Sequence, residues 1–388
     1  LVAVNTKGRL AFIRERELKG LAARVAKVDW SGDGKKICAV DGTGQLRVWD
    51  AATGEQLGAH NLEMKMSWRP MAFSSDLKLM AIGLDEQVSI RRVVDNVEVT
   101  RISPPLDPKR KHTFLPSLAA MAFSPDDKRL LVGSTWASVW DVESGELIHK
   151  SRKLVTASCA ATWSRDGSKY AAHTAGYELY ARVDPAEVCI WDNESGEELN
   201  TFTIRPHGQY GYDFGMWVAT DYISFSPDGQ RIAVGSGTRG ARDQESYESK
   251  KCFVQVWDLK SGKSTRVVPE GSTAVGSLQF SSDGSLLAMH SDDKVRFWET
   301  ESGQELTTLK HNAKIISYDF HPSKNIVVIG HADGSVLVRR LVRGAAGRDV
   351  APDDNNPVSY THLRAHETQP VISYAVFCLK KGGGGGGG

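Results

Sequence analysis

The stretch "VAKVDWSGDGKKICAVDGTGQLRVWDAATGEQL" (Val25–Leu57) decides the fold of this chain. Its Val-, Ile-, Leu- and Trp-containing runs are too short for helices, and Asp-Gly, Gly-Thr-Gly and Thr-Gly separate them. Glycine supplies the positive φ that tight hairpins need, and aspartate caps its own turn. The stretch therefore predicts short antiparallel strands joined by turns.

Two signals from this stretch recur along the chain. The first is an aromatic residue followed by Ser-x-Asp or a variant of it, and its spacings range from 40 to 62 residues. Its copies begin at Trp30, Phe73, Phe123, Trp163, Phe225, Phe280 and Phe320. The second signal contains Trp-Asp or a replacement, at Trp49, Arg91, Trp140, Trp191, Trp257, Trp298 and Arg339. A period of roughly 40 residues with two turn signals per unit indicates four strands per repeat.

A four-stranded sheet cannot bury both of its faces alone. Sheets arranged radially as blades bury one another, and a closed ring protects the ends. The repeats resemble the WD-repeat β-propeller family over roughly Leu1 to Leu341. Its Trp-Asp dipeptide matches Trp49-Asp50, Trp140-Asp141, Trp191-Asp192 and Trp257-Asp258. The resemblance implies an all-β propeller that acts as an interaction scaffold.

Some units depart from the family pattern. Unit two has Arg91-Arg92 and unit seven Arg339-Arg340 in place of Trp-Asp, and unit six has Trp298-Glu299. The family's Gly-His dipeptide is nearly absent, although His60 and His311 fall near its place. We therefore expect hydrophobic packing, rather than the family's buried His–Ser/Thr–Asp–Trp network, to hold most blades.

The N-terminus adds part of another unit. "LVAVNTKGRLAFIR" (Leu1–Arg14) aligns without a gap with "ICAVDGTGQLRVWD" (Ile37–Asp50). This predicts seven four-stranded blades plus an incomplete eighth at the N-terminus, within a propeller domain over 1–344. The expected boundaries are about 1–20 for the partial blade and 22–60, 66–102, 117–152, 155–204, 218–268, 273–310 and 312–344 for the units, with a loop over 345–357.

The stretch Val358–Gly388 does not follow the repeat. "VSYTHLRAHET" and "ISYAVFCLKK" can be back-translated into strings that resemble a transposase-type DNA sequencing adapter, and a run of g bases would encode the glycines. We interpret this stretch as a non-native, adapter-derived tail. A metal-binding or linker tail is the alternative. His362, His366 and Cys378 accordingly receive no functional role.

Composition argues against several classes of protein. The chain has 48 Lys and Arg against 47 Asp and Glu, so net charge favours neither nucleic-acid nor membrane binding. No run of 18 apolar residues is present, and the five cysteines form no CxxC pair. Few cysteines and no signal-peptide pattern fit a cytoplasmic protein, although a lost signal stays open because the chain begins at Leu1 rather than Met.

No motif indicates catalysis, a cofactor or a metal. "GSGTRG" (Gly235–Gly240) matches GxGxxG, but a polar insert and a strand follow it instead of a helix, so we interpret it as a loop within one blade. "SGKST" (Ser261–Thr265) lacks the earlier glycine of a phosphate-binding loop. Neither GxSxG nor HExxH occurs. The sequence therefore predicts a protein that is not an enzyme.

The long insertions are expected on one face of the propeller. They lie between second and third strands in units four and five, and before the first strands of units three and five. Strands alternate in direction, so both loop types emerge on the same face. The insertion before unit three also carries the basic cluster "PKRKH" (Pro108–His112), which is interpreted as a solvated loop.

The insertions around units four and five are rich in aromatic residues and arginine, which dominate binding hot spots. We predict a protein or peptide partner on this face, with packing between the loops as the alternative. A sensor or substrate-binding module of a larger enzyme, or a propeller enzyme, is the second functional class. The candidate partner-binding residues are Tyr177, Tyr180, Arg182, Tyr210, Tyr212, Phe214, Trp217, Arg239, Arg242 and Tyr247.

Overall fold

The computed structural model describes most of the repeat region. The described residues are 3–4, 10–63, 70–84, 86–105, 118, 120–134, 136–151, 160–174, 186–204, 217–239, 252–272, 277–291 and 293–342. They all fall in one compact unit, Leu1–Val350. Every regular element in these ranges is a β-strand. They contain no helix with the length and apolar character of a membrane span.

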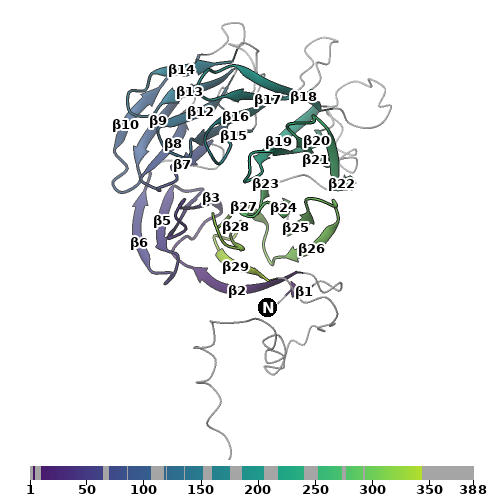
Figure 1. Ribbon diagram of the computed structural model, residues 1–388. Coiled ribbons are helices and arrows are strands. Elements are labelled where there is room, and N and C mark those ends of the chain that lie inside the picture. Colours follow the sequence, from purple (N-terminus) through teal and green to yellow (C-terminus); the bar gives the residue numbers. More distant parts are fainter. Residues whose placement is uncertain are drawn as a thin grey trace, which may run out of the picture. The chain divides into compact units, whose positions relative to one another are not determined.

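The strands form seven antiparallel sheets, which are the blades of a propeller (Figure 1). Blades one and two contain β3 (Val25–Trp30), β4 (Lys36–Asp41), β5 (Gln45–Asp50), β6 (Gln56–Asn61), β7 (Met71–Phe73), β8 (Leu79–Leu84), β9 (Gln87–Arg92) and β10 (Glu98–Ile102). Blades three and four contain β11 (Ala120–Phe123), β12 (Arg129–Gly133), β13 (Ala137–Asp141), β14 (Leu147–Lys150), β15 (Ala161–Trp163), β16 (Lys169–Thr174), β17 (Ala186–Asp192) and β18 (Glu198–Ile204).

Blades five and six contain β19 (Trp217–Phe225), β20 (Arg231–Arg239), β21 (Cys252–Asp258), β22 (Ser264–Ser272), β23 (Leu278–Phe280), β24 (Leu286–Ser291), β25 (Lys294–Glu299) and β26 (Glu305–Lys310). Blade seven contains β27 (Ile315–Phe320), β28 (Ile326–His331) and β29 (Val336–Val342), together with β1 (Ala3–Val4) and β2 (Ala11–Leu18). First strands of neighbouring blades contact one another near the axis of the ring, as β27 does with β3 and β11 with β7 and β15. The prediction of an all-β propeller with seven four-stranded blades is confirmed.

The predicted eighth blade is wrong. β2 pairs antiparallel with β29, from Phe12 opposite Leu341 to Leu18 opposite Val336, and is the fourth strand of blade seven. β1 adds to the outer side of β2. The physical reason is that β27 to β29 leave one edge of β29 to be paired, and β2 covers the backbone groups of that edge.

The repeated aromatic-Ser-x-Asp signal builds the turn after each first strand. In blade one, the Ser31 hydroxyl donates to Asp33 Oδ1 at 2.7 Å, and the Lys35 and Lys36 amides donate to Asp33 Oδ1 and Ser31 Oγ at 2.9 Å. Gly34 completes the turn with φ 69°. Serine and aspartate thus fix this hairpin through local bonds to the backbone.

Seven hydrophobic clusters occupy the seven junctions between neighbouring blades. The tryptophan of the second signal packs against the preceding blade. Trp140 of blade three, for example, joins Ile90 of blade two. Trp49 of blade one likewise joins Val328 and Val336 of blade seven, so this junction closes the ring. Burial between blades is the main contribution to the stability of such a repeat.

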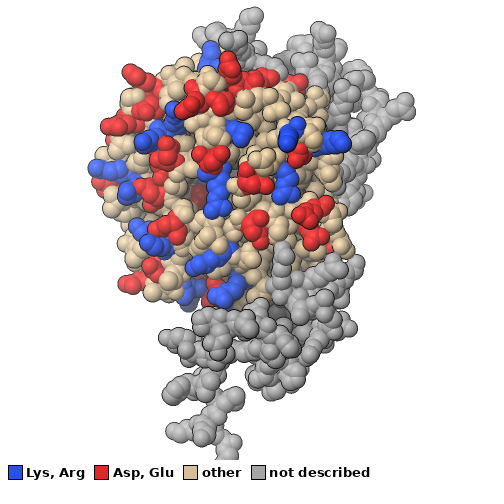
Figure 2. All heavy atoms as spheres, in the orientation of Figure 1, with Lys and Arg blue, Asp and Glu red and all other residues tan. Residues whose placement is uncertain are grey.

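Charged side chains are mixed on the outside of the ring. Over the face seen in Figure 2, Lys and Arg alternate with Asp and Glu, and neither sign covers a continuous area. This agrees with the nearly balanced composition of the chain.

Candidate functional site

Two of the predicted partner-binding residues lie opposite each other in blade five. Trp217 begins β19, Arg239 ends β20, and the two are register partners. The sequence prediction placed both in loops, which is wrong. The other predicted site residues lie outside the described ranges and stay a prediction: Tyr177, Tyr180, Arg182, Tyr210, Tyr212, Phe214, Arg242 and Tyr247.

Blade five is extended at the edge where these two residues lie. β19 and β20 each have nine residues, whereas β15 and β23, the first strands of the neighbouring blades, have three. The pairing continues from Thr220 opposite Ser236 to Trp217 opposite Arg239. "GSGTRG" is therefore strand up to Arg239, because its backbone groups pair with a β19 segment of strand-favouring residues.

A second candidate site lies at the axis, where three blades are linked by side chains. Asp319 on β27 accepts the Trp30 amide of blade one through Oδ2 at 2.7 Å. Its Oδ1 accepts Gln279 Nε2 of blade six, also at 2.7 Å. The Gln279 Oε1 atom in turn accepts the Phe320 amide at 3.3 Å. The first strands of blades six, seven and one are thus connected through one carboxylate and one amide.

The linking residues share one position in the repeat. Each stands directly before the aromatic residue of the first signal, as Ser224 does in blade five, where it accepts the Phe280 amide at 3.5 Å. Blades two and three have Ala72 and Ala122 at that position, which have no side-chain acceptor. Sequence reasoning missed this position, although aligning the repeats would have shown its polar residues.

Charges gather beside this link. Lys27 Nζ donates to Asp29 Oδ1 at 3.0 Å on β3. Burial of Lys27 lowers its pKa, but the Asp29 carboxylate reverses this and the pKa is raised overall. Burial raises the pKa of Asp29, and Lys27 opposes that rise. Burial and then the charge of Asp29 raise the pKa of Asp319 to about 7.

One mouth of the ring is crossed by Arg165, from the first turn of blade four. Its Nη2 donates to the Pro322 carbonyl at 2.9 Å, and its Nη1 donates to the Ser282 carbonyl at 3.3 Å. These carbonyls belong to the corresponding turns of blades seven and six. Between the first turns of blades one and two, the Gly32 amide donates to the Ser75 carbonyl at 2.6 Å. Bonds between turns therefore join the blades at this mouth.

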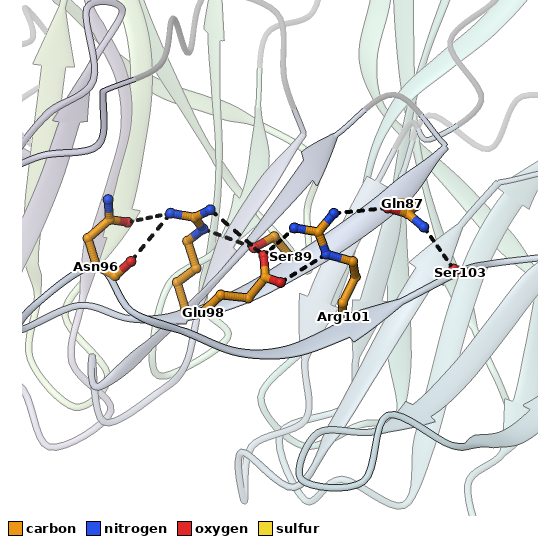
Figure 3. A network of polar contacts seen from close by, with 7 residues as sticks. Gln87, Ser89, Asn96, Glu98, Arg101 and Ser103 are labelled. Carbon is orange, nitrogen blue, oxygen red and sulfur yellow. Dashed lines mark hydrogen bonds and ion pairs between the residues drawn. The ribbon is translucent and has the colours of Figure 1, made fainter.

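Unit two, which has Arg91 in place of tryptophan, contains a polar network (Figure 3). Arg91 Nε donates to Ser89 Oγ at 2.9 Å, and the Ser89 hydroxyl donates to Glu98 Oε2 at 2.5 Å. Arg101 donates to both Glu98 oxygens at 2.9 and 2.8 Å. Hydrogen bonds from Arg101 and Ser89 lower the pKa of Glu98 to about 2. The network ties β9 to the outer strand β10.

A buried histidine pair lies where blade six leads into blade seven. His311 Nδ1 and His331 Nε2 are 2.8 Å apart, and His331 Nδ1 lies 3.0 Å from the Ser335 carbonyl. Since that carbonyl can only accept, His331 Nδ1 carries the proton and Nε2 accepts from His311. Burial lowers the pKa of His311 to about 3, so the pair is neutral. Here, then, hydrophobic packing is supplemented by a polar chain.

Side chains that could bind a metal are not gathered in the part of the chain that is described: no group of three or more His, Cys, Asp or Glu is placed to hold an ion. The carboxylates at the axis are instead bound to Lys27, the Trp30 amide and Gln279. Their geometry is that of a structural link between blades.

The ring and its repeated turns define a seven-bladed β-propeller. Comparison with known proteins agrees. A family model described as "WD domain, G-beta repeat" matches residues 262–299. The guanine nucleotide-binding protein subunit beta-5b of Danio rerio is 23% identical over 344 residues, which cover 85% of this chain and 77% of that protein.

Two further relatives match over shorter regions. Protein tipD of Dictyostelium discoideum is 31% identical over 130 residues, which are 33% of this chain and 19% of that protein. Autophagy-related protein 16 of Arabidopsis thaliana is 24% identical over 244 residues, which are 61% of this chain and 42% of that protein. With the seven blades, these similarities agree with the resemblance to the WD-repeat β-propeller family.

Proposed function

We propose that this propeller is a non-catalytic scaffold that binds a protein or peptide partner on the face carrying the long loops of blades four and five. The observation that carries the proposal is the extended edge of blade five, where Trp217 and Arg239 are register partners. Tryptophan and arginine are enriched among the residues that dominate binding energy.

The similarity to propeller proteins supports this function. One relative is named as a subunit of a guanine nucleotide-binding protein, and a subunit acts through an assembly. Scaffolding also fits the mixed surface charge, which favours neither nucleic acid nor an acidic membrane.

Partner capture with single substitutions tests the proposal. The full chain and its Trp217→Ala and Arg239→Ala variants are cross-linked in an extract of the source organism, and the captured proteins are quantified by mass spectrometry. The matched control is Lys260→Ala, an exposed residue in the turn at the opposite edge of blade five. We expect loss of the same partners in both edge variants and none in the control. If the full chain, both edge variants and the control are all folded and capture the same partners equally, the proposed face is wrong.

A further inference from the structure

The junction of blades six, seven and one contains two carboxylates and one ammonium group. Asp29 directly precedes Trp30, whose amide is bonded to Asp319, so the carboxylates lie on neighbouring first strands at the same level. Among the described residues, Lys27 is the only cation that forms an ion pair with either of them, and it bonds Asp29. Blade six contributes the uncharged Gln279.

Other titratable groups nearby do not neutralise Asp319. The Tyr318 hydroxyl on β27 donates to the Ala288 carbonyl at 2.7 Å, and burial raises the pKa of that phenol. Cys38 on β4 is buried, and burial raises the pKa of its thiol well above the usual range. With Lys27 charged and Asp29 ionised, the junction is neutral when Asp319 is protonated and has a charge of minus one when it is not.

The two cross-blade bonds lower the pKa of Asp319, but burial and the charge of Asp29 outweigh them, and neither bond requires the negative charge. Each oxygen of Asp319 accepts one hydrogen bond, which leaves a lone pair for a proton. Ionisation, by contrast, adds a second buried negative charge beside Asp29, without a cation of its own. The protonated form is therefore the one that fits this junction.

We propose that this junction is a proton-controlled latch of the ring, closed most firmly when Asp319 is protonated and Asp29 is paired with Lys27. The latch joins blade seven, which β2 completes, to blades one and six. Deprotonation of Asp319 favours local opening at these three strands while the other junctions are unaffected.

The sign of the pH effect follows from linkage. The pKa of Asp319 is about 7 in the closed junction, whereas an exposed aspartate titrates near 4. Between these values the closed state binds more protons than the opened state. The free energy that favours the closed junction is thus greatest near pH 4 and falls as pH rises toward about 7.

Hydrogen–deuterium exchange of the full chain tests the latch. Exchange is followed by mass spectrometry between pH 5 and pH 7. The exchange times are corrected for the pH dependence of the intrinsic amide exchange rate. The latch segments are 25–30 and 315–320, and the reference segments are 71–73 and 120–123, where Ala72 and Ala122 occupy the linking position. We expect corrected exchange in the latch to rise roughly tenfold or more over this range, with no change in the reference. If exchange rises with pH by the same factor in the latch segments and in the reference segments, the proposal is overturned.

Three variants make the test specific. Asp319→Asn should abolish the pH response, and Asp29→Asn should reduce it by removing the like charge. Asp29→Asn also keeps the Trp30–Asp319 bond, so it remains informative if Asp319→Asn fails to fold. Asp33→Asn, in the exposed part of the first turn, should leave the response unchanged. If Asp319→Asn or Asp29→Asn keeps the full pH-dependent rise in exchange, the proposed latch is overturned.

Discussion

The ring of Phe12 on β2 packs against the ring of Phe297 on β25, with centroids 4.8 Å apart. This contact joins β2, the fourth strand of blade seven, to blade six, and Phe12 is fully buried there. Phe12→Ala would remove aromatic contacts and leave a cavity, so we expect a loss of about 3 kcal/mol or more in the free energy of unfolding. Chemical denaturation of the full chain measures it.

The neighbouring residue offers the control. Ile13 lies on the same strand but is 37% exposed. Ile13→Ala should cost less than about 1 kcal/mol, since most of the lost surface already faces water. Equal losses for the two variants would show that β2 is not a packed part of the ring.

The blades could be predicted from sequence because their signals are local. The aromatic-Ser-x-Asp turn and the Trp-Asp strand each lie within a few residues, and both recur. The role of the N-terminal strand could not be predicted, because the pairing of Phe12 with Leu341 connects distant parts of the chain and leaves no local pattern. A repeat alignment therefore counted β2 as the start of another blade.

The candidate sites show the same division. Trp217 and Arg239 were singled out by residue type, but their pairing depends on the register of β19 and β20. Asp319 and Gln279 occupy a visible repeat position, yet their mutual bond requires two blades to be neighbours at one level. The sequence therefore indicated some residues of each site, but it did not indicate which of these residues lie next to one another in the structure.

Gly330 on β28 is expected to be intolerant of any side chain. A Cβ atom there would lie 2.5 Å from Val25 Cγ1 of blade one. Gly330→Ala should therefore lower the free energy of unfolding by about 1–3 kcal/mol. At Gly58 the nearest atom would be 3.8 Å away, so Gly58→Ala serves as the matched control and should change stability little.

A double mutant separates the clash from other effects. Adding Val25→Ala to Gly330→Ala frees the space that the new methyl group needs. The combined loss should be smaller than the sum of the single losses by at least about 0.5 kcal/mol. Additive losses would argue that the two blades do not approach as closely as described.

Trp140 and Trp298 occupy the same repeat position but differ in one hydrogen bond. Trp140 Nε1 donates to the buried Ser138 hydroxyl at 2.9 Å, whereas Trp298 Nε1 has no acceptor among the described residues. Trp140→Phe should consequently cost about 1 kcal/mol more than Trp298→Phe, because it also leaves Ser138 without its donor. Thermal and chemical denaturation of the two variants would give the difference, and equal costs would contradict the role assigned to the bond.

Glu98 is expected to make stability depend on pH at the acidic end. Its pKa is about 2 in the folded protein because Arg101 and Ser89 hydrogen-bond to the carboxylate, whereas an unfolded glutamate titrates near 4.3. The unfolded state therefore binds more protons between these values. The stabilising contribution is complete above roughly pH 4.3 and is lost as pH falls toward about 2.

Glu98→Gln tests this by removing the charge while keeping the shape of the side chain. At pH 7 the variant should be less stable than the original protein, because Arg101 and Arg91 lose their shared carboxylate. Denaturation curves at pH 7, 4 and 2.5 should show the difference shrinking as Glu98 becomes protonated. Glu55→Gln, an exposed change in the turn before β6 of blade one, should show no such convergence. A difference that is constant over this pH range would mean that the network of unit two holds β10 by packing and neutral hydrogen bonds rather than through the charge of Glu98.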